Sequence, residues 1–174
     1  MSTILIAFLL VAIIIIISFV LVLLNNKHRQ RTAIKIVNLF NNVGRETGLS
    51  FSKKEIHENF IIGLDAVQKK ILSLRKTGNK YNSLVIDLQQ VKSCSKKKVY
   101  EQVNMGTIKN QKFETVLDKI VLEFDYPDKR EPVQISFYEA GRDHLFEMDD
   151  LVRKAGSWEV LLTKTINNKL KSTV

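Results

Sequence analysis

The feature that most constrains this chain is an uninterrupted apolar run near its N-terminus. Residues 4–24 contain no charged side chain and only one polar one, Ser18. A helix rises about 1.5 Å per residue, so this run would measure roughly 31 Å, close to the hydrocarbon thickness of a bilayer. The sequence therefore predicts a transmembrane anchor over residues 1–24.

The charges that flank this run predict its orientation. Lys27, Arg29, Arg31 and Lys35 follow it, whereas only the α-amino group precedes it. The positive-inside rule then places the N-terminus outside and the rest of the chain in the cytoplasm. The absence of a basic residue before the run and of a small-residue cleavage site after it argues against a signal peptide. A lone cysteine, Cys94, suits a reducing compartment. We expect a single-pass protein of the cell membrane.

Residues 25–48 have the pattern of a basic amphipathic juxtamembrane helix or linker ending near Gly44 or Gly48. Apolar side chains recur there at the i, i+3, i+4, i+7 spacing of one helical face: Ile36, Leu39, Phe40 and Val43. The pattern leaves open whether this face meets the membrane interface, the following domain or a second copy of the chain.

Residues 49–174 have the pattern of a small α+β domain. Short apolar or alternating runs between turn residues predict strands at 59–64, 71–76, 83–88, 117–124 and 133–138, with an edge strand near 96–100. A helical stripe begins near His144 and continues to Ile166. We expect an antiparallel six- or seven-stranded sheet, or partly open barrel, capped by a C-terminal helix. Residues 92–112 would supply a seventh strand.

This order of elements resembles the pleckstrin-homology (PH) superfold. The segment 155–166, with its single tryptophan Trp158, is similar to the C-terminal helix that closes the barrel in that family. The resemblance implies two near-orthogonal sheets with Trp158 filling the open end. In PH-like domains the first hairpin often forms a lipid head-group site. The resemblance places four basic residues on such a hairpin: Lys69, Lys70, Arg75 and Lys76. The alternative for these four residues is a solvated basic face.

The charge distribution points to an anionic partner. Residues 48–100 hold eleven Lys or Arg against four Asp or Glu, whereas residues 101–174 hold eleven against thirteen. The basic half is therefore expected to contact anionic lipid head groups or an acidic protein partner. Nucleic acid is disfavoured because few aromatic residues are interleaved with the lysines.

The sequence offers no pattern for catalysis. It has no P-loop, G-x-S-x-G, G-x-G-x-x-G or H-E-x-x-H motif, and its three histidines are too far apart in sequence to suggest a metal site. We expect no cofactor and no metal. Cys94, flanked by lysines, is either a reactive thiol or an ordinary strand residue. The sequence favours a membrane-anchored, non-enzymatic binding or scaffold module. The alternatives are a structural subunit of a larger membrane assembly and an enzyme with an unrecognised site.

Overall fold

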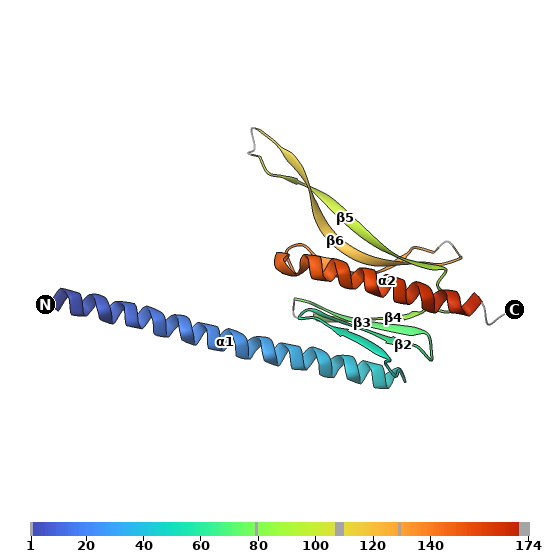
Figure 1. The fold of residues 1–174 in the computed structure, drawn as a ribbon, viewed down its shortest axis with the longest axis horizontal. Helices are drawn as coiled ribbons and strands as arrows, with labels where there is room; N and C mark the ends of the chain where they lie inside the picture. Colours follow the sequence, from blue (N-terminus) through green and yellow to red (C-terminus); the bar gives the residue numbers. More distant parts are fainter. Residues whose placement is uncertain (1, 79, 107–109, 129, 171–174) are drawn as a thin grey trace.

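A computed structural model describes the backbone of residues 2–78, 80–106, 110–128 and 130–170, and within these the side chains of residues 13–21, 23 and 33–168. In this part of the chain, two long helices and seven strands form the fold (Figure 1). In chain order they are α1 (Ser2–Glu46), β1 (Lys53–Ile56), β2 (Phe60–Asp65), β3 (Lys70–Thr77), β4 (Lys80–Asp87), β5 (Ser93–Asn104), β6 (Phe113–Asp125), β7 (Val133–Glu139), the 3-10 turn η1 (Leu145–Glu147) and α2 (Met148–Leu170).

The strands form two antiparallel sheets. A four-stranded sheet has the order β1-β2-β3-β4, and a three-stranded sheet has the order β5-β6-β7. The main core lies between the two sheets and α2, which contacts all three strands of the smaller sheet. The C-terminal part of α1 lies on the opposite face of the four-stranded sheet (Figure 1).

Strand β2 is apolar along its whole length because both of its faces are covered. Phe60 and Ile62 point into the main core, whereas Ile61 points outward and packs with Ile36 and Phe40 of α1. All six residues of β2 are buried. The apolar face predicted within residues 25–48 therefore packs on the following domain, which is one of the three possibilities that the sequence left open.

The C-terminus of α1 is set by a glycine. Gly48 has a φ of +67°, the left-handed conformation that glycine adopts without steric cost. The amide of Leu49 donates to the carbonyl of Gly44 at 2.8 Å, and that of Gly48 donates to Arg45 at 3.1 Å. These two bonds form a Schellman motif, which satisfies carbonyls at the helix end and turns the chain toward β1.

Helix α2 buries one stripe of side chains against the main core: Leu151, Ala155, Trp158, Leu162 and Ile166. Trp158 is among the largest fully buried side chains. The polar face of α2 also holds an edge of the smaller sheet. Glu159 accepts a hydrogen bond from the amide of Lys96 at 2.7 Å, and Thr163 donates to the carbonyl of Cys94. Side chains of α2 therefore occupy the outer backbone groups of β5 at Cys94 and Lys96.

The prediction that the fold begins with a transmembrane helix is wrong. Residues 4–24 belong to α1, which continues without a break to Glu46. Within the described part of the chain, no helix combines the length and the apolarity that a bilayer crossing requires.

The same finding overturns the predicted single-pass localisation at the cell membrane and the membrane-anchored class. The side chains of residues 4–12 and of the basic residues that led to the orientation, Lys27, Arg29 and Arg31, lie outside those described.

The predicted edge strand at 96–100 is β5, which is longer, and the described part of residues 92–112 forms no further long strand beside it. The seventh strand of the fold is β1. The sequence analysis missed β1, which pairs with β2 from Lys53 opposite Leu64 to Ile56 opposite Ile61. The chain is thus α+β, with antiparallel sheets of four and three strands and a C-terminal helix.

Candidate functional site

The four basic residues predicted as a site do not meet at one place. They lie in and after the β2–β3 turn, which is the second hairpin of the fold because β1 precedes it. Lys69 occupies the turn with a φ of +54°, and Lys70 begins β3. Arg75 and Lys76 lie at the other end of the strand. At about 3.3 Å per residue, Lys70 and Lys76 are roughly 20 Å apart.

Arg75 bridges the two sheets. Its side chain leaves β3 on the inner face, its guanidinium lies 4.9 Å from the centre of the Phe60 ring, and Nη2 donates to the carbonyl of Ser136 in β7 at 2.6 Å. Nη1 lies 3.6 Å from a carboxylate oxygen of Asp143. Burial lowers the pKa of Arg75 and Asp143 opposes this, and an arginine stays charged at neutral pH in either case.

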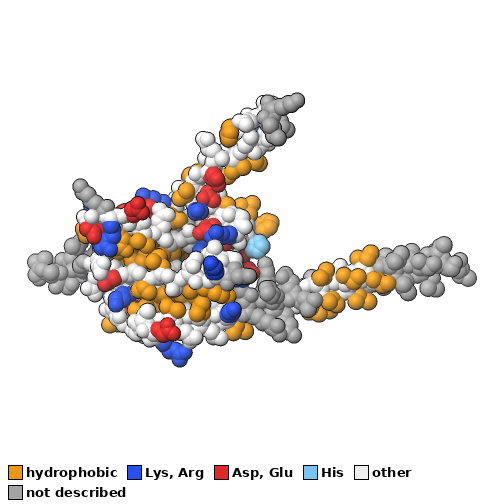
Figure 2. All heavy atoms as spheres, turned by 180° about the vertical axis from the view of Figure 1, so that it is seen from behind, with side chains coloured by type: hydrophobic (Ala, Val, Ile, Leu, Met, Phe, Trp, Pro, Cys, Tyr) orange, Lys and Arg blue, Asp and Glu red, His pale blue; other side chains and the backbone are white. Residues whose placement is uncertain are grey.

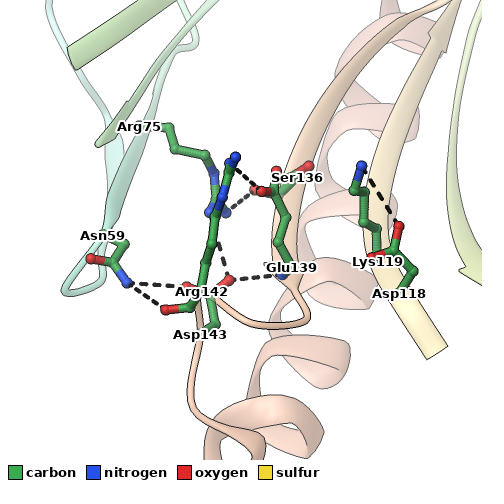
Figure 3. A network of polar contacts seen from close by, with 8 residues as sticks. All are labelled: Asn59, Arg75, Asp118, Lys119, Ser136, Glu139, Arg142 and Asp143. Carbon is green, nitrogen blue, oxygen red and sulfur yellow. Dashed lines mark hydrogen bonds and ion pairs between the residues drawn. The ribbon is translucent and has the colours of Figure 1, made fainter. Parts of the chain in front are cut away.

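Asp143 organises the loop that follows β7 (Figure 3). One carboxylate oxygen accepts from the amide of Glu139 at 2.8 Å, and the other accepts from the Asn59 side chain at 3.3 Å. Asn59 also donates to the carbonyl of Arg142, whose guanidinium pairs with Glu139. In Figure 3, Asn59 and Arg75 approach from the four-stranded sheet, and their partners belong to β7 and its loop. This network fixes the corner at which β4 and β7 face each other.

A polar cleft opens at this corner. Its volume is about 350 Å³. Hydrogen-bonding side chains make up most of its lining, with an apolar floor of Leu84 and Ile135; the lining residues are Ser73, Arg75, Thr77, Asn82, Ser83, Leu84, Gln134, Ile135, Ser136, Glu139 and Arg142. A second recess of about 240 Å³ adjoins it, lined by Asn59, Lys76, Gly78 and Arg142.

Both strands beside the cleft present backbone groups to it. In an antiparallel strand the N–H and C=O of one residue point to the same side, and the side alternates along the chain. Ser136 accepts from Arg75 across the cleft, so Ser136 and Gln134 direct their backbone toward it. In β4, the amide of Leu88 donates to Lys69 of the preceding turn, so alternation turns Ser83 away from β3. Ser83 also lines the cleft.

The charge balance of the corner is positive. Arg75 pairs with Asp143 and Arg142 pairs with Glu139. Two further cations lie near the cleft: Lys76 lines the adjoining recess, and Lys80 lies opposite Thr77, a residue of the cleft lining, in the strand register. Two of the four predicted residues, Arg75 and Lys76, therefore belong to this corner, whereas Lys69 and Lys70 lie at the far end of β3.

The described residues offer little for nucleophilic or metal chemistry. Cys94 is buried in the core, and burial, followed by Glu159 and Asp125, raises the pKa of its thiol to about 12. The thiol is thus protonated at neutral pH, so it is a poor nucleophile. Among the described residues, no group of three or more His, Cys, Asp or Glu side chains is placed to hold a metal ion.

One feature of the sequence indicates the cleft. Ile71, Ser73 and Arg75 share the inner face of β3, so polar residues replace apolar ones where the strand approaches the corner. A core position occupied by serine or arginine indicates that the core opens there. The contribution of β7 and its loop to the cleft could not be predicted from the sequence, because it depends on how the two sheets pack.

Comparisons of this chain with models of protein families, with curated proteins and with solved structures found no match.

Proposed function

We propose that this chain is a non-enzymatic protein-binding module that holds an extended acidic segment of a partner in the cleft between β4 and β7. The observation that carries the proposal is the pair of strand edges, at Ser83 of β4 and Gln134 of β7, that flank one cleft and have no strand beside them. At Ser136 the carbonyl already accepts from Arg75. Unpaired edges bind extended chains through main-chain hydrogen bonds, and neighbouring side chains supply the selectivity.

The lining fits a polypeptide backbone. Serine, threonine, asparagine and glutamine side chains both donate and accept hydrogen bonds, as peptide groups do. The apolar floor of Leu84 and Ile135 accommodates one side chain of an extended segment. Lys76 and Lys80 favour carboxylates beside the cleft, so binding weakens as salt concentration rises.

The architecture supports a PH-like module as the scaffold of this site. Its support is the succession of a four-stranded sheet, a three-stranded sheet and a helix that buries Trp158 between them. In this reading the cleft belongs to the corner between the last strands of the two sheets, and the helix covers the other side of the core.

Strand addition is tested with two synthetic peptides, one alternating glutamate with valine and one alternating lysine with valine. The acidic peptide is expected to bind the full chain, more weakly at high salt, and the basic peptide is not. Ser83→Pro removes an outward amide without breaking a bond to β3. It should weaken binding roughly fivefold, the value of one hydrogen bond of about 1 kcal/mol, whereas Ser83→Ala should change it little. Equal binding by both variants would contradict strand addition.

Charge reversal locates the acidic contact. The double variant Lys76→Glu with Lys80→Glu should abolish binding of the acidic peptide. The matched control, Lys69→Glu with Lys70→Glu, makes the same change of charge at the far end of β3 and should leave it intact. Loss in the control instead would move the site to the β2–β3 turn. Binding to phosphatidylserine vesicles that only the control variant loses would identify a lipid head-group site there.

A further inference from the structure

A second interaction surface lies on the hairpin of β5 and β6, far from the cleft. Beyond the end of β7, which pairs with β6 as far as Lys119, the two strands continue alone as an arm, residues 100–105 and 112–118 (Figure 1). The arm, with Val99 at its base, exposes apolar side chains: Tyr100, Val103, Met105, Phe113 and Val116. Figure 2 shows such side chains along the arm, as along α1. A two-stranded hairpin is marginally stable alone in water, so an arm with this composition gains from a covering partner.

The unpaired backbone groups of the arm can be identified from two hydrogen bonds. The amide of Lys96 points outward to Glu159, and the amide of Met105 points inward to the carbonyl of Lys112. The direction of the backbone N–H and C=O groups alternates along the strand, so counting from either residue gives the same result. The groups that point outward from β5 are those of Lys98, Tyr100, Gln102 and Asn104. Side chains of α2 hold the edge at Cys94 and Lys96, so the edge from Lys98 to Asn104 is the part open to another strand.

We infer that this edge pairs with the same edge of a second copy of the chain, antiparallel about a two-fold axis at Gln102. The pairing joins the two smaller sheets into one continuous six-stranded sheet. Two-fold interfaces are self-complementary, so one stretch of edge must suit its own reversed sequence.

Charges and neighbouring structure argue against two alternative axes. An axis at Glu101 would set two Glu101 carboxylates directly opposite each other, which is destabilising. An axis at Tyr100 would bring Asn104 of the second copy against Lys96, where Glu159 already occupies the edge. The axis at Gln102 avoids both conflicts.

The side-chain pairs at the selected axis are compatible. Val99 lies opposite Met105 of the second copy, Tyr100 opposite Asn104, and Glu101 opposite Val103. No like charges face each other directly, and the pair of Val99 with Met105 covers apolar area on one face. Gln102 faces its own copy, and amide side chains in such a position donate and accept reciprocally.

Disulfide crosslinking of the full chain tests both the dimer and its register. Opposed residues in a hydrogen-bonded antiparallel pair have Cα atoms about 5.5 Å apart, within the range that a disulfide spans. Gln102→Cys should therefore form a covalent dimer under mild oxidation. Tyr100→Cys is the matched control, because its copy lies four residues along the partner strand, roughly 13 Å away. Cys94 is buried and should not compete.

Crosslinking at Tyr100→Cys and not at Gln102→Cys would overturn the register, and a chain that crosslinks at neither position would overturn the dimer. Sedimentation of uncrosslinked variants gives an independent measurement. Gln102→Pro removes the outward amide at the axis and should raise the dimer dissociation constant about tenfold or more, whereas Gln102→Thr should change it little. Because the apolar part of α1 is the same in every variant, association through it would leave all of them equal, a result that would also overturn the proposal.

Discussion

The two ends of strand β6 have similar sequence character and opposite surroundings. At the C-terminal end, residues 120–124 are buried between β5, β7 and α2, and Phe124 is 0% exposed. At the N-terminal end, Phe113 is 58% exposed and belongs to the arm. Both ends have strand-forming residues and a β5 partner, so the difference arises from what covers the hairpin. β propensity reports fit to a half-buried surface more than a preference of the backbone.

The two ends of β6 therefore have different roles, one in the stability of the fold and one in contacts with another chain. The buried end holds the core together, whereas the exposed end contributes little to the core and leaves apolar side chains and an unpaired edge for a second chain. The cleft between β4 and β7 has an intermediate character, because a buried ion pair fixes its walls and its strand edges stay open.

The largest effect is expected from truncating phenylalanine at the two ends of β6. Phe124→Ala removes a fully buried ring and should lower the free energy of unfolding by about 3–5 kcal/mol. Phe113→Ala should change it by less than about 0.5 kcal/mol. Urea denaturation measures both changes, at protein concentrations too low for the arms of two chains to pair. Comparable losses at the two positions would mean that the arm packs against the body.

The elements that face the core could be predicted from the sequence. Elements that form only through contacts with other elements could not. The runs at 59–64, 71–76, 83–88, 117–124 and 133–138 coincide closely with strands, because burial imposes alternation or continuous apolar character. Strand β1, with the sequence Lys-Lys-Glu-Ile, has no such pattern. It forms by pairing with β2, and its side chains reach α2: Lys53 lies 5.3 Å from the centre of the Trp158 ring, and Glu55 pairs with Lys154.

The candidate site was less predictable than the fold. Positive charge suggested Lys69, Lys70, Arg75 and Lys76 together, but strand geometry divides them between opposite ends of β3. Asp143 and Ser136 come from a distant part of the chain and meet Arg75 only through packing of the two sheets. The apolar N-terminal run led to a predicted anchor that no helix in the described part of the chain supports.

An intermediate loss of stability is expected when the ion pair between β3 and the loop after β7 is broken. Asp143 is 6% and Arg75 12% exposed in their side chains, so Arg75→Met leaves a buried carboxylate without its cation. We expect the free energy of unfolding to fall by about 3 kcal/mol. Adding Asp143→Asn should recover part of that loss, because the uncompensated charge is gone. If the double variant is as unstable as the sum of both single variants, the two residues act independently and Arg75 does not hold the corner through Asp143.

The smallest effect on the free energy of unfolding is expected at two turns, one between β2 and β3 and one between β5 and β6. The dependence of this effect on pH distinguishes the two turns. Asp65 is buried at the β2–β3 turn and accepts backbone hydrogen bonds from Ser50, Val67 and Gln68 at 2.7–2.9 Å. Burial alone would raise the pKa of this carboxyl, but the three amides outweigh it and hold the pKa below its ordinary value. At the base of the arm tip, the neutral side chain of Asn104 accepts from Gly106 and Lys112.

A carboxyl whose pKa is lower in the folded than in the unfolded chain stabilises the fold above its unfolded pKa of about 3.9, and this contribution disappears as pH falls through the folded pKa. Asp65→Asn should therefore cost about 1–2 kcal/mol at pH 7 and progressively less below pH 4. Asn104→Ala should cost under about 1 kcal/mol with no dependence on pH in this range. Unfolding curves at pH 7 and at pH 3 measure both. A cost of Asp65→Asn that stays constant with pH would mean that the turn depends on the shape of the side chain and not on its charge, and the two hairpins would then be closed by the same means.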